Sequence, residues 1–355
     1  MISAVVDTAA LRHNLSRVRE IAPKSRVLAV LKANAYGHGM VAVASALAGA
    51  DGFAVARLEE AITLRAAGHA QRIVLLEGVQ GAEQLREAAE NGLELVVHEP
   101  GQIALLEAWR GEHLFQIWLK IDTGMGRLGF RPGELTAALG RLADCKAIIR
   151  PVALMTHLAE AELRDSERTH AQLECFERLT TGLPGERSIA NSAGMIGWPA
   201  TRTGWVRPGL MLYGISPFAG EIGADLGLRP AMTLESRVIA VRELMAGDRV
   251  GYGGAWTASR ATRIAVVAAG YGDGYMRNTA GGTPVLVNSR QAQLAGRVSM
   301  DMLTVDVTDL PLVAIGDPVV LWGGGVPVEI VAAAAGTIPY ELVCRVSERV
   351  HIDVR

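Results

Sequence analysis

Residues 27–39 read Val27-Leu-Ala-Val-Leu-Lys32-Ala-Asn-Ala-Tyr36-Gly-His-Gly39, and their pattern indicates the fold class. Five apolar residues run without alternation as far as Lys32, and a loop of small residues and glycines follows them. A short continuous apolar run is typical of a strand that is buried on both faces, as in a parallel sheet. The segment therefore predicts a buried strand whose carboxyl end leads into a glycine-rich loop.

The same succession of an apolar run, a turn and an amphipathic stretch repeats as far as about residue 220. Helical patterns such as Leu58–Ala67 and Glu83–Asn91 lie between the runs, and each is followed by a glycine, which commonly ends helices. Strands that alternate with helices predict βαβ units, and eight units fit a closed (β/α)₈ TIM barrel, which needs roughly 250 residues. The predicted strands are Arg26–Leu31, Gly52–Ala56, Arg72–Leu76, Leu93–Val97, Phe115–Ile121, Pro151–Thr156, Ser188–Ala190 and a last one around Gly209–Tyr213.

A doubly wound open sheet is the competing architecture, because it also alternates parallel strands with helices. Such sheets often carry a G-x-G-x-x-G loop directly after the first strand, where the loop binds a dinucleotide. The residues after Leu31 have no such pattern. We therefore favour the barrel.

The sequence pattern changes after about residue 230, where short Val-rich segments are separated by Gly, Asp or Asn turns. This pattern is typical of an all-β domain. We expect a barrel domain over residues 1–230, with residues 1–10 as candidates to join the second domain, and a mostly-β domain over residues 231–355. The predicted strands of the second domain are Ser236–Arg242, Thr262–Ala268, Pro284–Val287, Met302–Val307 and Pro318–Trp322; helices are predicted at Val331–Ala335, at Tyr340–Val346 and at Leu11–Ile21, which could pack against the second domain.

Composition excludes several classes of protein. The 355 residues include 35 Lys plus Arg and 37 Asp plus Glu, so the formal net charge of −2 lacks the basic footprint of a nucleic-acid binder or a membrane-surface protein. No basic segment precedes the first apolar residues, and no apolar run approaches the roughly 18 residues of a transmembrane helix. The three cysteines are far apart and odd in number, which favours a reducing compartment. We expect a cytoplasmic protein.

Lys32 is the first candidate functional residue, because it ends a predicted barrel strand and the carboxyl ends of such strands form barrel active sites. A lysine that is desolvated there can form a Schiff base with a carbonyl cofactor. A solvated lysine at a strand terminus is the alternative. Tyr36 and His38 follow in the same loop and add polar groups to it.

Lys120 and Arg127 form a second constellation within Lys120-Ile-Asp-Thr-Gly-Met-Gly-Arg127. Lys120 lies inside an apolar strand, and a buried lysine needs a partner or a modification that removes its charge. Arg127 offers a planar fork that suits a carboxylate. A lysine that reaches out of the strand edge and an arginine on a surface loop are the plain alternatives.

A third constellation lies beside the last two predicted barrel strands, where many barrels hold a phosphate with backbone N–H groups and small hydroxyls. Ser192, Gly209 and Leu210 suit that task, and Arg207 suits either a phosphate or a ring nitrogen; ordinary turn chemistry is the alternative. In the second domain, tyrosines and charges are embedded among glycines in Val250–Trp256, Gly270–Tyr275 and Gly296–Asp301.

Taken together, these segments resemble the alanine racemases, a family of pyridoxal 5′-phosphate enzymes built on a barrel plus a β-domain. The resemblance runs through nearly the whole chain in order: VLKANAYGHG, LKIDTGMGRLGF, the MTH that contains His157, NSAG, WVRPGLMLYG, VGYGG, GYGDGY, GRVSMDM and the terminal YE. Any one of these motifs is weak alone, and it is their joint order and spacing that identifies the family.

The resemblance implies a role for each matched residue. Lys32 holds the cofactor as a Schiff base and is one catalytic base, and Tyr252 is the base on the opposite face. Arg207 contacts the pyridine nitrogen with support from His157, and Lys120 is carbamylated and orients Arg127. The resemblance also implies alanine as substrate, no metal, and a head-to-tail homodimer with shared active sites. The phosphate is bound by Tyr36, Ser192, Gly209, Leu210 and Tyr340, and the substrate carboxylate by Arg127 and the backbone of Met300.

Two departures from the family pattern are Met276, where Pro is common, and the Leu-Ala-Glu that follows His157. Three rival functions remain: a non-catalytic cofactor-carrying barrel, a decarboxylase or aldolase, and a racemase of broader specificity, for example for serine. The long region after the barrel weighs against the first, and no cysteine falls in the loop that a decarboxylase would use. The sequence leaves open whether D-alanine serves peptidoglycan synthesis or alanine is catabolised.

Overall fold

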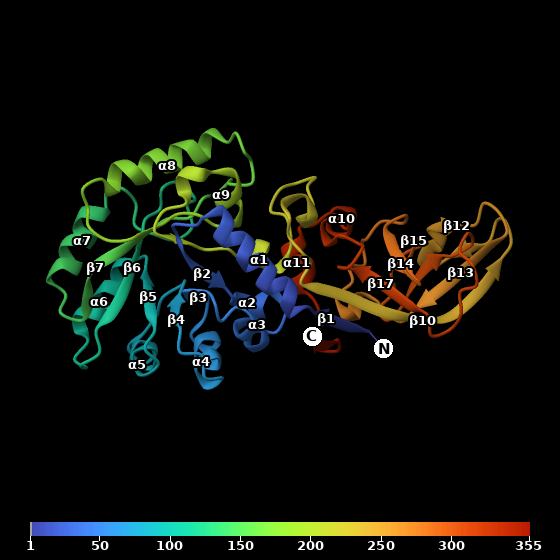
Figure 1. Ribbon diagram of the computed structural model, residues 1–355, viewed down its shortest axis with the longest axis horizontal. Helices are drawn as coiled ribbons and strands as arrows, with labels where there is room; N and C mark the ends of the chain where they lie inside the picture. Colours follow the sequence, from blue (N-terminus) through green and yellow to red (C-terminus); the bar gives the residue numbers. More distant parts are fainter. Residues whose placement is uncertain (1) are drawn as a thin grey trace.

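The computed structural model describes residues 2–355, and the first part of the chain forms a closed barrel of eight parallel strands (Figure 1). Strand order follows the sequence, and the ring closes where Arg26 of the first barrel strand pairs with Trp205 of the last. The predicted (β/α)₈ barrel is confirmed. Its strands are β2 (Arg26–Val30), β3 (Gly52–Val55), β4 (Arg72–Leu75), β5 (Glu94–Val97), β6 (Phe115–Lys120), β7 (Ile148–Met155), β8 (Arg187–Ser188) and β9 (Trp205–Val206).

The apolar runs form strands because both of their faces are covered. Every residue of β3 and β5 is buried, between the side chains inside the barrel and the helices outside it. The rings of Trp118 and Trp205 meet edge to face at 5.7 Å. The helices of this part are α2 (Lys32–Tyr36), α3 (Met40–Ala46), α4 (Leu58–Ala66), α5 (Ala82–Glu90), α6 (Pro100–Ala108), α7 (Leu135–Asp144), α8 (Glu167–Thr180) and α9 (Ser192–Gly197).

The prediction of a last barrel strand around Gly209–Tyr213 is wrong. The closing strand is β9, only two residues long, and residues Leu210–Tyr213 form the 3₁₀ turn η2, which is fully buried. A short apolar run does not distinguish a buried strand from a buried helical turn. Pro208 also lacks the N–H that a central strand would donate, so the strand ends before it.

The second part of the chain is a mostly antiparallel eight-stranded sheet, which confirms the predicted β-domain. The long strand β10 pairs with both β17 and β13, so six of the strands run round in a ring (Figure 1). Two short helices, α10 (Val328–Ala334) and α11 (Pro339–Cys344), return the chain toward the barrel. The strands are β10 (Met232–Leu244), β13 (Thr262–Val267), β14 (Pro284–Val287), β15 (Arg290–Leu294), β16 (Leu303–Asp306), β17 (Pro318–Trp322), β18 (His351–Val354) and the separate pair β11 (Arg249–Val250) and β12 (Trp256–Thr257).

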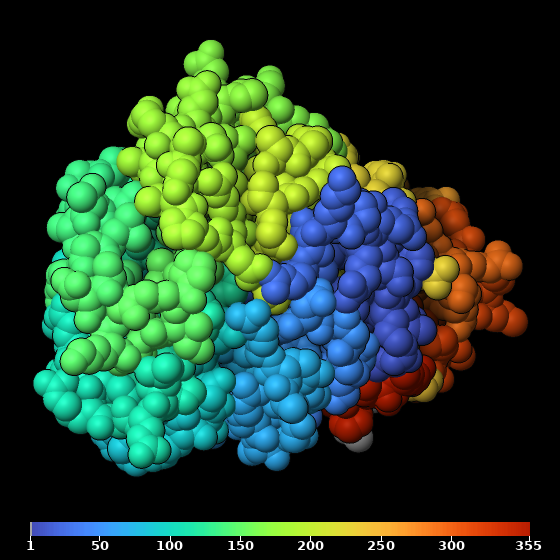
Figure 2. All heavy atoms as spheres, turned by 60° about the vertical axis from the view of Figure 1, so that its left-hand side comes forward, coloured from blue at the N-terminus to red at the C-terminus, as the bar shows by residue number. Residues whose placement is uncertain are grey.

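The amino terminus connects the two parts. Strand β1 (Ser3–Val6) lies in the second sheet between β10 and β18, and helix α1 (Thr8–Ile21) follows at once. The main packing of α1 is against α3 and η2 of the barrel, where the buried Asn14 amide bonds the carbonyls of Leu212 and Arg229 at 2.9 and 2.8 Å. In the space-filling view the blue first residues lie between the barrel and the red last residues (Figure 2).

Candidate active site

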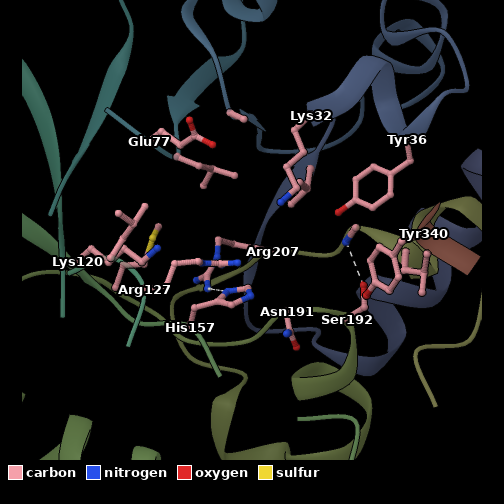
Figure 3. A pocket seen from close by; sticks show the side chains of 17 residues that line it. Lys32, Tyr36, Glu77, Lys120, Arg127, His157, Asn191, Ser192, Arg207 and Tyr340 are labelled. Atoms are coloured by element: carbon pink, nitrogen blue, oxygen red, sulfur yellow. Dashed lines mark hydrogen bonds between the residues drawn. The ribbon is translucent and has the colours of Figure 1, made fainter. Parts of the chain in front are cut away.

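The carboxyl ends of the barrel strands enclose a cavity of about 280 Å³. Lys32 follows β2, Lys120 ends β6 and His157 follows β7, so strand termini point their polar side chains into one space (Figure 3). The cavity brings together ten of the residues singled out in the sequence: Lys32, Tyr36, Lys120, Arg127, His157, Ser192, Arg207, Gly209, Leu210 and Tyr340.

Lys32 is followed by a turn of unusual backbone geometry. Residues Ala33 to Tyr36 all have φ between +53° and +54°, which is a left-handed turn of four residues other than glycine. Each such residue costs about 1–2 kcal/mol, so the surrounding structure must hold the turn. The Glu60 carboxylate accepts from the Ala33 N–H at 2.7 Å, and the Asn34 side chain accepts from the Met40 N–H at 2.8 Å. A strained but well-anchored turn is typical of a functional site.

The Lys32 amine is only partly exposed and faces other cations. Burial, and then the nearby Arg127 guanidinium, lower the pKa of Lys32. A lowered pKa enlarges the neutral fraction of the amine, which is the form that attacks a carbonyl carbon. The cavity therefore favours covalent chemistry at Lys32.

Tyr36, Ser192 and Gly209 form a small polar cradle on one side of the cavity (Figure 3). The Ser192 hydroxyl accepts from the backbone N–H groups of Gly209 and Met211 at 3.0 and 3.3 Å. A Cβ at Gly209 would lie 2.5 Å from the Tyr36 hydroxyl oxygen, so only glycine leaves this space open. Tyr340 of α11 packs its ring 5.9 Å from that of Tyr36. Hydroxyls and backbone N–H groups in this arrangement suit a phosphate.

Arg207 is buried at the floor of the cavity and is held by neutral acceptors. Its guanidinium donates to the Ser188 hydroxyl at 2.5 Å and the Thr156 carbonyl at 2.7 Å, and it lies 3.3 Å from Nδ1 of His157. Burial lowers the pKa of Arg207 to about 10, so it stays charged at neutral pH. Burial, and then Arg207, lower the pKa of His157 well below its usual value, so this imidazole is neutral.

Lys120 is 9% exposed, and its surroundings disfavour a positive charge. Burial, followed by the nearby Arg207, Arg127 and Lys32, lowers the pKa of Lys120 to about 8. About a tenth of this amine is therefore neutral at pH 7, far more than of an exposed lysine, and a modification that made it an anion would relieve the repulsion.

Glu77 is a cavity residue that the sequence did not single out. It follows β4 and is the one carboxylate among the described lining residues, opposite Lys32, Lys120, Arg127 and Arg207. The excess of cations favours an anionic ligand. The position of Glu77 after a predicted barrel strand was the available signal, but a lone glutamate in a loop carries no motif.

Tyr252 and Met300 lie outside the cavity. Tyr252 is 60% exposed in the turn η4 (Tyr252–Gly254), and the Arg277 guanidinium lies over its ring at 5.6 Å. Met300 is 52% exposed and belongs to the same domain. Within one chain, the predicted second base and the predicted carboxylate-binding backbone are thus separate from Lys32.

Comparison with known proteins gives one consistent result. A family model for the alanine racemase N-terminal domain matches residues 6–217, and one for the C-terminal domain matches residues 231–354. The chain is 52% identical over 348 residues to an alanine racemase of Nitrosococcus oceani, which covers 98% of this chain and 97% of that one. An alanine racemase of Yersinia pestis is 47% identical over 351 residues, covering 99% and 98%.

Solved structures agree. The crystal structure of the biosynthetic alanine racemase from Pseudomonas aeruginosa matches with a TM-score of 0.96 and 46% identity, covering 100% of this chain and 99% of that one. The alanine racemase from Acinetobacter baumannii matches with a TM-score of 0.94 and 36% identity, covering 100% and 99%.

Proposed function

The chain belongs to the alanine racemase family and is an amino-acid racemase, and from this premise we propose that it interconverts L- and D-alanine by a two-base mechanism with pyridoxal 5′-phosphate. The observation that carries the proposal is the cavity itself, which holds a lysine of lowered pKa together with hydroxyls and backbone N–H groups that suit a phosphate. The amino-acid racemase activity rests on the family; the cofactor and the residue roles are the proposal.

The residues of the cavity fit a phosphorylated aldehyde. Lys32 would supply the amine that bonds to the aldehyde carbon, and Arg207 would hold the ring nitrogen. The phosphate would be held by Tyr36, Ser192, the backbone of Gly209 and Leu210, and Tyr340. When bound, pyridoxal 5′-phosphate shares the negative charge that develops as the substrate α-proton leaves.

Inversion of a stereocentre needs a proton acceptor and a proton donor on opposite faces of the α-carbon. We assign Nζ of Lys32 to one face and the Tyr252 hydroxyl to the other. Arg127 binds the substrate carboxylate through its guanidinium, and the Met300 backbone N–H donates to the same group. Held at two points, the α-carbon presents its hydrogen to one base or the other.

An arginine beside the ring nitrogen has a chemical consequence. The pKa of Arg207, at about 10, lies well above that of a pyridine, so the proton stays on the guanidinium. Arg207 would then donate a hydrogen bond to the ring nitrogen without protonating it, and the bound ring would withdraw electrons less strongly. We infer that this arrangement limits side reactions such as transamination, while the two bases offset the lower acidity of the substrate.

We propose that Lys120 is carbamylated and that the resulting anion orients Arg127. The neutral Nζ attacks carbon dioxide, a C–N bond forms, and one proton is released to solvent. Because the pKa of Lys120 is about 8, the neutral fraction rises with pH and falls to about 1% at pH 6. We therefore expect protein from a degassed pH 6 buffer to lack the modification, and protein from bicarbonate at pH 9 to carry it.

Mass spectrometry of the intact, undenatured protein checks this prediction through a mass increase of one carbon dioxide, and racemisation should rise with it. The exposed Lys146 gives the matched control: Lys146→Ala should keep the mass increase and Lys120→Ala should lose it. An unmodified protein with full activity at pH 9 would contradict the assignment.

The separation of Tyr252 from Lys32 supports a head-to-tail homodimer in which the second domain of each chain completes the partner's cavity. We accordingly propose the division at residues 230 and 231 as a functional one: residues 1–230 hold the cofactor, joined by Tyr340 at its phosphate, and residues 231–355 supply the second base. Strand β1 pairs with β10, so Ser3–Val6, a part of residues 1–10, is assigned with the second domain in this scheme.

Within residues 2–355, no helix has the length and apolarity needed to cross a bilayer. We propose a cytoplasmic enzyme, since its three cysteines are free in the structure. We further propose that it supplies D-alanine for peptidoglycan, with alanine catabolism as the alternative role.

The direct test follows the optical rotation of pure L-alanine and, separately, of D-alanine, with enzyme and added pyridoxal 5′-phosphate. We expect both rotations to decay to zero. L-Serine in parallel distinguishes strict from broad specificity, because a hydrophobic pocket rejects an analogue that only adds a hydroxyl by no more than about a hundredfold. A yellow protein that leaves both rotations unchanged would mean that it binds the cofactor without racemising alanine.

A further inference from the structure

Gln172 is a buried amide that reaches the active site from outside the barrel. It lies on α8 and is 1% exposed, and its side chain extends between the loops that follow β6 and β7. Oε1 accepts from the Ala159 N–H at 2.8 Å, and Nε2 donates to the His157 carbonyl at 3.1 Å and to the Thr123 hydroxyl at 3.3 Å. One side chain thus uses its acceptor and both of its donor hydrogens.

The Thr123 end of this network leads to the loop that carries Arg127. Thr123 bonds the Thr156 hydroxyl at 2.8 Å, and Thr156 in turn donates to the Ile121 carbonyl at 2.9 Å. Asp122 next to it accepts from the backbone N–H groups of residues 124, 125 and 126, which shapes the turn just before Arg127. A shift of Thr123 would therefore move the base of the Arg127 loop.

The His157 end leads to Arg207. Gln172 holds the backbone on both sides of Leu158, through the His157 carbonyl and the Ala159 N–H. The His157 ring lies against the Arg207 guanidinium, which also donates to the Thr156 carbonyl at 2.7 Å. The position of Arg207 thus depends on the segment that Gln172 fixes.

We propose that Gln172 is a positioning residue that fixes the position of Arg127 relative to Arg207. This inference rests on the roles proposed above for those two arginines. Only an amide can serve, because the site needs one acceptor and two donors, and the chain leaves little space around it: a Cβ at Gly124 would lie 3.3 Å from Gln172 Cγ.

The test is Gln172→Glu, which keeps the size and the acceptor and removes the donors. The variant leaves the His157 carbonyl and the Thr123 hydroxyl without their donor, and the loss of a buried hydrogen bond commonly changes an equilibrium constant about tenfold or more. We expect kcat/KM for alanine to fall about tenfold to a hundredfold, with KM raised and kcat lowered together, because both guanidinium groups shift from their positions in the cavity. The absorption band of the bound cofactor should also shift at equal occupancy, since it senses Arg207.

Thr123→Val separates the two ends and avoids a buried carboxylate. It removes the hydroxyl at the base of the Arg127 loop and leaves the bonds of Gln172 to the His157 carbonyl and the Ala159 N–H, so we expect KM for alanine to rise several-fold while the cofactor band stays unchanged. Thr169→Val is the matched control: Thr169 is buried on the same helix, and its hydroxyl has no hydrogen-bond partner among residues 2–355. We expect this variant to behave as wild type in both assays.

Wild-type kinetics and an unshifted band in Gln172→Glu would overturn the proposal. A fall in kcat/KM in Gln172→Glu that is no larger than the fall in Thr169→Val would overturn it too. If Gln172→Glu does not fold, an unchanged KM in Thr123→Val overturns it instead. If the wild-type protein itself does not racemise alanine, the proposed function fails first, and the cofactor band alone still reports whether Gln172 positions Arg207.

Discussion

Lys32→Ala is expected to abolish racemisation, with a loss of at least about a thousandfold, and to remove the yellow absorbance of the purified protein. The physical reason is that Lys32 both holds the cofactor covalently and supplies one of the two bases. The phosphate cradle remains, so the variant should still bind added cofactor, but weakly and reversibly. Absorbance after dialysis and the decay of optical rotation measure the two losses separately.

The small number of lysines makes this experiment clean. The chain carries lysine only at positions 24, 32, 120 and 146, and Lys24→Ala is a matched control because this residue is exposed. Borohydride reduction of the wild-type protein followed by peptide mapping should label Lys32 alone. A yellow band that survives dialysis in Lys32→Ala would move the attachment point to another lysine.

Tyr252→Phe is expected to reduce racemisation by about a hundredfold to ten-thousandfold while the protein stays yellow, because only one face loses its base. Lys32 still reaches its own face, so exchange of the α-hydrogen with deuterium from solvent should continue in one enantiomer and stop in the other. The measurement is mass spectrometry of each enantiomer after incubation in heavy water. Tyr271→Phe serves as the control, since Tyr271 lies near the same Arg277 guanidinium but outside the assigned chemistry.

Mixing two inactive variants distinguishes a shared site from a site within one chain. If Lys32 and Tyr252 of different chains meet, a hybrid of Lys32→Ala with Tyr252→Phe has one site with both native residues and one with neither. Half of the dimers are hybrids after equal mixing and exchange, so about one quarter of the wild-type activity should return. No recovery in a mixture whose hybrids are detected by mass would contradict the shared site.

The barrel was predictable because burial on both faces leaves a direct mark on the sequence. The strands β3 and β5, with every residue buried, read as unbroken apolar runs. The closing strand β9 has only two residues, too few for any pattern, and the apolar run of η2 next to it has the pattern of a buried strand. Strand β15 was missed because three of its five residues are exposed and polar, so its pattern resembles a loop.

The candidate site was predictable where chemistry concentrates in motifs. Lys32 and Lys120 stand out because a charged residue rarely lies at the end of a buried strand without a function, and Arg127 stands out because it follows Lys120 in the same glycine-rich motif. Glu77 and Gln172 belong to no such motif, since one is a lone loop residue and the other a polar position on an amphipathic helix. Their importance comes from what the fold places beside them, which only the three-dimensional contacts reveal.

The position of β1 has a consequence for how the chain is made. Strand β1 leaves the ribosome first, but its partners are β10 and β18, and Thr8 bonds to Arg355 across 347 residues of sequence. Contacts of such long range form late and slow folding, because a large loop must close before they contribute. The barrel, whose strands pair with their neighbours in sequence, can assemble during synthesis, whereas the second sheet completes its edge only after residues 351–354 are free. A C-terminal tag or truncation therefore acts on the earliest strand of the chain as well as on the last.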